Sequence, residues 1–226
     1  MGSSLRKSLL NYFNNIIHKK YNFYINNDDQ NLLTIDELNT IKKMQYNVLL
    51  CHCSFNHPSV TDFSKLCFSI TCVREPVERF FSHYYYFVKP LSKLNFHELD
   101  DKDIPNIIIL CGGNLLTNRI SGQTNLFEDA IENLKYINCI MIQSQIKTDI
   151  KNLNNMLDNY THTTIDLELL YINTNTNDST QHINLDMTKI QPYMNLFYND
   201  INLYKYILNM KIEDRFKFTN ETSLSV

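Results

Sequence analysis

The sequence predicts an α/β fold in which a central, mostly parallel sheet is flanked by helices. Three short apolar runs with the length of buried strands, at residues 46–51, 66–73 and 139–143, are interleaved with segments of helical periodicity. The chain has 226 residues, of which 43% are hydrophobic, and this suffices for one substantial core. No internal repeat is visible, so we expect a single domain over residues 1–226.

Charge and composition exclude several classes of protein. A formal net charge of −3 argues against a general binder of nucleic acids or of anionic membrane surfaces, so any anion site must be local. No window of about 18 apolar residues that could span a membrane occurs, and there is no secretory signal. The 6 cysteines do not make a disulfide framework in a chain of this size. Cys51, His52, Cys53 and His57 match no zinc spacing, so we expect no metal.

The first half of the chain is expected to contain two helices and two strands. An amphipathic helix follows Gly2-Ser3-Ser4, and residues 22–45 are polar, which predicts an irregular connection with a short helix at 35–44. Buried strands are predicted at 46–51 and 66–73. Pro76 suits the first position of the next helix, which we expect to end before Pro90. The apolar residues that define the two helices are Leu5, Leu9, Tyr12, Phe13, Ile16 and Ile17, and then Val77, Phe80, Phe81, Tyr84 and Val88.

The second half is predicted to be mainly helical. Residues 107–120 and 126–136 are expected to form helices separated at Ser121-Gly122, followed by a buried strand at 139–143 and a helix at 146–157. Residues 172–184 form a low-complexity polar loop with a composition typical of disorder. A last helix at 194–216 carries Asp200, Leu203 and Tyr204.

The most informative stretch is CVREPVERFFSHYYYF, at residues 72–87. Arg74 stands at the end of a buried strand, on the edge where open α/β sheets bind ligands, and its guanidinium suits phosphate or sulfate. Ser82 lies on the following helix, one turn beyond Glu78 and off the apolar stripe, so its hydroxyl could share an anionic ligand with Arg74. In the alternative interpretation Arg74 is a surface residue paired with a carboxylate and Ser82 faces solvent.

Two other segments offer groups for such a ligand. Gly2, Ser3 and Ser4 precede a helix, whose first N–H groups could bind a second anionic group, although the same residues also make an ordinary helix cap. His52 ends the strand at 46–51, on the same sheet edge as Arg74, and histidine is the commonest general base near neutral pH. The alternative for His52 is a core histidine that is hydrogen-bonded to a backbone carbonyl.

Taken in order, these segments resemble the carbohydrate sulfotransferases, most closely the heparan sulfate and uronyl 2-O-sulfotransferases. CVREPVERFFSHYYYF resembles the 3'-phosphate-binding segment of that family, which has Arg-Asp-Pro, then Arg, then Ser and several tyrosines. MGSSLRKSLL resembles the end of the family's 5'-phosphosulfate loop, and LLCHCSF resembles its Gly-His segment. NLLTNRISG resembles its Asn…Thr-Arg…Ser-Gly stretch, and the helix that starts from Asp200 resembles its late Asp-x-x-Leu-Tyr helix.

The resemblance implies a P-loop-like sulfotransferase fold and the transfer of a sulfuryl group from PAPS (3'-phosphoadenylyl sulfate) to a hydroxyl of a carbohydrate acceptor, without a metal and without nucleic acid as a partner. It implies that Arg74 and Ser82 bind the 3'-phosphate of PAPS, that Gly2, Ser3 and Ser4 cradle its 5'-phosphosulfate, and that His52 takes the proton of the acceptor hydroxyl. Eukaryotic relatives are usually Golgi membrane proteins, so a Golgi location is implied if an anchor precedes Met1, and a cytoplasmic one otherwise.

The sequence departs from the family pattern at three places. The family loop begins with a Lys in a Pro-Lys-Thr-Gly-like string, whereas this chain starts at Met1, so we expect a chain truncated at its N-terminus. Glu75 replaces the usual Asp, and Cys51 replaces the usual Gly before His52. If Met1 is the natural start, the alternative is a catalytically impaired relative that binds a nucleotide or an anionic glycan. A nucleoside-phosphate kinase fits less well, because the chain has no G-x-x-x-x-G-K-[ST] loop.

Overall fold

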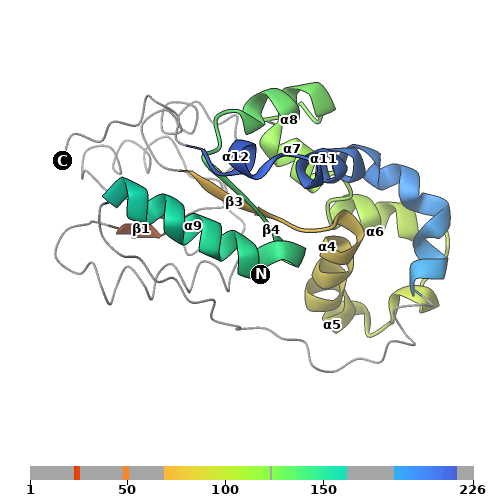
Figure 1. Ribbon diagram of the computed structural model, residues 1–226. Helices are drawn as coiled ribbons and strands as arrows, with labels where there is room; N and C mark the ends of the chain where they lie inside the picture. The colour runs from red at the N-terminus through yellow and green to blue at the C-terminus, as the bar shows by residue number, and fades with distance from the viewer. Residues whose placement is uncertain (1–22, 26–47, 51–68, 123, 162–185, 218–226) are drawn as a thin grey trace.

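The computed structural model describes residues 23–25, 48–50, 69–122, 124–161 and 186–217, and the strands within them form two parallel pairs (Figure 1). β1 (Phe23–Ile25) pairs with β2 (Val48–Leu50), and β3 (Ile70–Val73) pairs with β4 (Cys139–Ile142). In the second pair Val73 lies opposite Ile142, so both strands end at the same edge. The predicted mixed α/β class and the parallel pairing are confirmed in this part of the chain.

Helices make up most of the described chain. Between β3 and β4 lie α4 (Pro76–His83), a π-helical turn (Tyr84–Val88), α5 (Lys89–Ser92), a 3-10 turn (Phe96–Glu98), α6 (Ile104–Leu110), α7 (Leu115–Ile120) and α8 (Phe127–Leu134). After β4 come a 3-10 turn (Gln143–Gln145), α9 (Ile146–Thr161), a 3-10 helix (Gln191–Phe197), α11 (Tyr198–Leu208) and α12 (Ile212–Arg215). No helix of the described segments is both long enough and apolar enough to cross a lipid bilayer.

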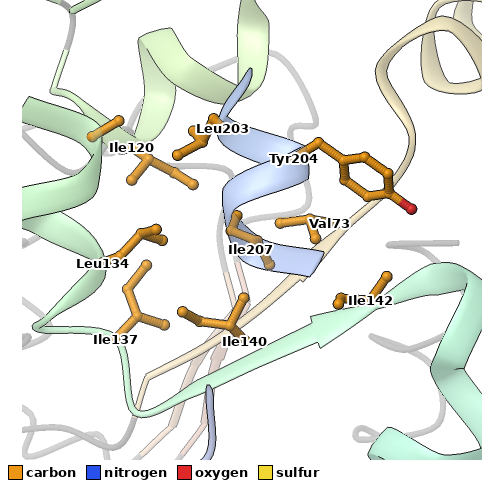
Figure 2. Packing of buried hydrophobic residues seen from close by; sticks show 10 residues of the cluster. Val73, Ile120, Leu134, Ile137, Ile140, Ile142, Leu203, Tyr204 and Ile207 are labelled. Atoms are coloured by element: carbon orange, nitrogen blue, oxygen red, sulfur yellow. The ribbon is translucent and has the colours of Figure 1, made fainter. Parts of the chain in front are cut away.

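One part of the core lies between the β3/β4 pair and the helices α7, α8 and α11. Ile140 and Ile142 of β4 belong to one cluster with Leu203 and Ile207 of α11, and Ile140 lies beside Ile207 (Figure 2). The buried residues of this cluster are Val73, Ile120, Ala130, Leu134, Ile137, Ile140, Ile142, Leu203, Tyr204 and Ile207. α9 contacts β4 as well, and its buried residues Ile146, Ile150, Leu153 and Met156 recur at helical spacing. Burial of β4 along its whole length therefore fixes the position of β3 beside it.

A second part of the core surrounds α4. The ring of Phe80 packs edge-on against Phe96 and Phe197, each with centroids 5.4 Å away. Val77 and Tyr84 are buried on the same stripe, as the periodicity predicted. Most aromatic residues of the stretch at 72–87 are therefore packing residues, which leaves its polar residues to be explained separately.

The predicted end of this helix before Pro90 is wrong. The chain passes from α4 into a π-helical turn, in which the Lys89 N–H bonds to the Tyr84 carbonyl five residues earlier, and continues as α5 through Pro90. A proline inside a regular α-helix clashes with the carbonyl four residues before it. Here Pro90 stands in the first turn of α5, where proline is tolerated. The helical segment ends at Lys93, whose φ of 60° is left-handed.

The predicted helix at 107–120 is interrupted in the structure. α6 ends at Leu110 and α7 begins at Leu115, because Gly112 adopts a φ of 78° that breaks the helix. A Cβ on Gly113 would lie 2.7 Å from the Leu196 carbonyl oxygen, so this turn packs against the Gln191–Phe197 helix. The predicted last helix at 194–216 is likewise divided into three helical segments.

Other expectations fall on different parts of the chain. The predicted strands at 46–51, 66–73 and 139–143 contain β2, β3 and β4. β1 lies inside residues 22–45, which we predicted to be an irregular connection, so the prediction is wrong at those three residues. The predicted helices at 5–17 and 35–44 and the polar loop at 172–184 lie outside the described residues.

Candidate functional site

Arg74 occupies the junction between a parallel strand and a helix. It is the first residue after β3, at the carboxyl edge that β3 shares with β4, and α4 begins two residues later at Pro76. Glu75 has an extended backbone, with φ −52° and ψ 129°, as expected for a residue before proline. Its carboxylate accepts the Glu78 N–H at 2.6 Å and so caps the helix. The Glu-Pro pair therefore makes a sharp strand-to-helix turn immediately beside Arg74.

The Arg74 guanidinium is only loosely paired. Its Nε lies 3.5 Å from an Oε atom of Glu78, which is long for a hydrogen bond, and the Glu78 side chain is 64% exposed. The Arg74 side chain is 29% exposed, yet its Nε is enclosed and has no hydrogen-bond partner among the described residues. A solvated pair of this kind contributes about 0–1 kcal/mol. The contact with a carboxylate is the one that the alternative interpretation expected, but the pair is weak enough to be exchanged for a better anion.

Ser82 follows Glu78 by four residues on α4. Residues at this spacing are neighbours on the surface of a helix, so Arg74, Glu78 and Ser82 succeed one another along one side of the junction. Ser82 is half-buried, and its hydroxyl forms no hydrogen bond within the described part of the chain. The structure therefore places the two predicted 3'-phosphate ligands on the same side of α4, with Glu78 between them.

Asp200 and Arg79 form a buried polar centre that we did not predict. Asp200, on α11, is fully buried, and its carboxylate accepts the N–H groups of Leu116 at 2.9 Å and Thr117 at 2.6 Å, which caps α7. Arg79, on α4, has Nη2 at 3.3 Å from Asp200 Oδ2 and also donates from Nη2 to the Gly112 carbonyl. We call these two residues the Arg79–Asp200 pair.

Burial perturbs both members of the Arg79–Asp200 pair. Desolvation lowers the pKa of Arg79, against the opposing effect of the Asp200 charge. Desolvation likewise raises the pKa of Asp200, against its hydrogen bond from Thr117 and the charge of Arg79. Nε and Nη1 of Arg79 are enclosed without hydrogen-bond partners among the described residues. The desolvation of both charges therefore offsets much of their attraction. The pair contributes a fixed arrangement of α4 and α11 rather than a large net stabilisation.

Three segments that the sequence analysis singled out meet at this pair. Arg79 belongs to the stretch at 72–87, Leu116 and Thr117 belong to NLLTNRISG, and Asp200 starts the late helix. Asn114 adds a contact, because its side-chain carbonyl accepts the Asp200 N–H at 3.1 Å. A pair between residues 121 positions apart leaves no local signal in a sequence. The local signal that could have indicated a buried ion pair is the position of Asp200 in the first turn of a helix that carries apolar residues.

Two other polar centres hold the fold together. Arg215 of α12 is buried and donates to Asp149 of α9 at 2.9 Å and to the Ile140 carbonyl at 3.2 Å. Asp186 accepts the backbone N–H of His97 at 2.9 Å, contacts its Nδ1 at 2.8 Å and accepts the Tyr85 hydroxyl. Both carboxylates lie among backbone amides and side chains of several elements, as expected of buried structural carboxylates.

The remaining predicted site residues are not described by the structure. His52, Gly2, Ser3 and Ser4 lie outside the described residues, so Arg74 and Ser82 are the members of the predicted set that the structure describes. Within the described segments, no group of three or more His, Cys, Asp or Glu residues could hold a metal ion.

Comparison of the chain with protein-family models, with curated proteins and with solved structures finds no match.

Proposed function

We propose that the chain is a PAPS-dependent sulfotransferase with a P-loop-like fold that transfers a sulfuryl group to a hydroxyl of a carbohydrate. The observation that carries the proposal is the position of Arg74, directly after β3 at the carboxyl edge of a parallel pair, with α4 and Ser82 beyond it. Ligands of open α/β sheets bind at this edge. Arginine at such a place suits a phosphate group, which accepts two parallel hydrogen bonds from one guanidinium.

The contacts of Arg74 favour exchange of Glu78 for a phosphate group. The present ion pair is long and exposed on its acidic side, and contributes about 0–1 kcal/mol. A hydrogen bond to a charged group is worth about 1.5–3 kcal/mol, and a phosphate could accept from both the guanidinium and the Ser82 hydroxyl. The enclosed Nε–H of Arg74 would gain the acceptor that it lacks among the described residues. The 3'-phosphate of PAPS therefore fits better than the carboxylate.

The proposed reaction is an in-line transfer that depends on positioning and on charge stabilisation. The oxygen of the acceptor hydroxyl forms a bond to sulfur while the bond from sulfur to the phosphate oxygen of PAPS breaks, and adenosine 3',5'-bisphosphate leaves with that electron pair. In the proposal His52 takes the proton of the acceptor hydroxyl, and Gly2, Ser3 and Ser4 cradle the 5'-phosphosulfate. No metal takes part.

Binding of adenosine 3',5'-bisphosphate tests the donor site by calorimetry. We expect micromolar binding that Arg74→Ala weakens at least tenfold, or about 1.4 kcal/mol. Ser82→Ala should weaken it by a smaller factor, because it removes one neutral donor. Glu78→Gln should tighten binding, since it removes the carboxylate that competes for Arg74. Lys135→Ala is the control, because it breaks a surface ion pair with Glu132 on α8, away from α4.

Two results would contradict parts of the proposal. If the folded protein does not bind the bisphosphate, Arg74 and Ser82 are not a donor site. If it binds the bisphosphate but transfers no labelled sulfate from PAPS to any glycan in a panel of uronic acid and hexosamine polymers, the chain is a nucleotide-binding protein without transferase activity.

A further inference from the structure

Arg79 lies next to Ser82 on the surface of α4. It precedes Ser82 by three residues and follows Glu75 by four, and both spacings make neighbours on an α-helix. Its side chain is 19% exposed and turns toward the Arg79–Asp200 pair, whereas Glu78, on the other side of Ser82, is largely exposed. Ser82 thus lies on the helix surface between the solvated side chain of Glu78 and the side chain of Arg79, which is held in the interior.

Burial of its apolar stripe sets which side of α4 faces the interior, and directional contacts then fix its exact rotation about its own axis. Val77, Phe80 and Tyr84 are buried against side chains of neighbouring elements, and such contacts are non-directional. Hydrogen bonds are directional and weaken steeply when they are misaligned. Two side chains of α4 make such contacts: Arg79 donates to Asp200 and to the Gly112 carbonyl, and His83 Nδ1 lies 3.2 Å from the Cys111 carbonyl. Of the two, Arg79 also reaches α11.

The groups that receive Arg79 are themselves held in place. Asp200 belongs to α11 and is fixed by the two amides at the start of α7. Gly112 lies in the turn between α6 and α7, and the Gly113 N–H bonds to the Ile108 carbonyl at 2.9 Å. Arg79 therefore ties α4 to α11 and to the α6–α7 turn, and His83 adds a second contact with that turn.

We propose that Arg79 and Asp200 are a positioning pair for the anion site. They fix the rotation of α4 about its axis and thereby the direction in which the Ser82 hydroxyl points relative to the Arg74 guanidinium. This inference rests on the proposed function, because it concerns the site that would bind the 3'-phosphate of PAPS. Neither residue needs to touch the ligand.

Two substitutions perturb the pair while they preserve most of its volume. Arg79→Lys keeps the positive charge but loses the planar guanidinium that reaches Gly112 and Asp200 together. Asp200→Asn keeps one oxygen acceptor but loses the charge that pairs with Arg79. Arg215→Lys is the matched control, because it weakens a buried arginine–aspartate pair that does not involve α4.

The measurement compares two ligands for each variant by calorimetry. Adenosine 3',5'-bisphosphate carries the 3'-phosphate, and adenosine 5'-monophosphate lacks it. We expect Arg79→Lys and Asp200→Asn to lower the affinity for the bisphosphate at least tenfold and to leave that for the monophosphate unchanged. Arg215→Lys should keep the ratio of bisphosphate affinity to monophosphate affinity that the unsubstituted protein shows. Each titration is made at a temperature at which circular dichroism shows the variant to be folded, so that a general loss of stability does not alter the ratio.

The outcomes separate the two proposals. If the unsubstituted protein does not prefer the bisphosphate to the monophosphate, the donor site itself is wrong, and the positioning role is wrong with it. If the unsubstituted protein shows this preference and folded Arg79→Lys and Asp200→Asn retain it, the donor site stands and the pair is a structural contact only. An equal loss of preference in Arg215→Lys would also overturn the positioning role.

Discussion

Truncation of Asp200 to alanine should be more damaging than removal of its partner Arg79. Asp200→Ala takes away the ion pair at 3.3 Å and both acceptors of the α7 amides, at 2.9 Å and 2.6 Å. It leaves Arg79 with only the Gly112 carbonyl among its described partners. Arg79→Met, in contrast, leaves the Asp200 carboxylate with its two backbone N–H donors.

The expected losses follow from the groups left behind. Removing one partner of a buried ion pair costs about 3–5 kcal/mol, and this range already includes an uncompensated buried charge. Loss of a helix cap typically costs about 1 kcal/mol and overlaps with it. We therefore expect Asp200→Ala to lower the free energy of unfolding by about 4 kcal/mol. Arg79→Met should lower it by about half as much, because the carboxylate keeps two amide hydrogen bonds and can take up a proton.

Urea denaturation at pH 7, followed by circular dichroism, measures both losses. With an m-value near 2 kcal/mol/M, 4 kcal/mol moves the midpoint by about 2 M. A loss below about 1 kcal/mol for Asp200→Ala would mean that the carboxylate is solvated. A larger loss for Arg79→Met than for Asp200→Ala would show that the amides of α7 do not depend on this carboxylate.

Three further results are expected. Burial raises the pKa of Cys72 from 9.0 to about 11, so at pH 8 its alkylation by iodoacetamide should be ~100-fold slower than that of an unperturbed thiol, and a normal rate in peptide mass spectrometry would contradict this. Gly113→Ala should lower the free energy of unfolding by about 1–3 kcal/mol in urea, because the new Cβ would lie 2.7 Å from the Leu196 oxygen, and a neutral effect would mean that the turn can shift. Burial raises the pKa of Asp200 above its unfolded value of about 3.9, so its contribution to stability is complete below that pH and is lost as pH rises through the folded pKa. On acidification from pH 7 to 4 the unsubstituted protein should therefore gain stability relative to Asp200→Asn in urea titrations, and parallel pH profiles of the two proteins would count against a raised pKa.

The parts of the fold that were predicted correctly have local causes. β3 and β4 are short apolar runs, and Pro76 after Glu75 predicted the first residue of α4. The errors arise where a tertiary contact or a backbone geometry overrides periodicity. Ile107 to Ile120 has a continuous helical pattern, but Gly112 takes a left-handed φ, and Gly113 makes room for Leu196. The Gly-Gly pair is a turn signal that the sequence does show, and the periodicity outweighed it in the prediction, whereas the contact with Leu196 is visible only in the fold.

The candidate site divides in the same way. The prediction for Arg74 and Ser82 used adjacency to a strand end and helical spacing, both of which a sequence shows, and the structure confirms those two positions. The Arg79–Asp200 pair was missed because it joins α4 to α11 across 121 positions of the chain. Glu78 was recognised only as a residue one turn before Ser82, and its contact with Arg74 required coordinates.

Because of the π-helical turn at Tyr84–Val88, the orientation of α5 depends more on the number of residues in this turn than on which residues they are. Such a turn holds one residue more than a regular α-turn, which is equivalent to a one-residue insertion and advances everything after it by about 100° around the helix axis. Tyr86 and Leu91 face solvent in that phase, at 71% and 85% exposure. Deleting one tyrosine of the YYY run would rotate α5 against the interior and return Pro90 to a regular helical register. A substitution of Tyr86, by contrast, keeps the number of residues in the turn, so the residues after it keep their positions around the helix axis.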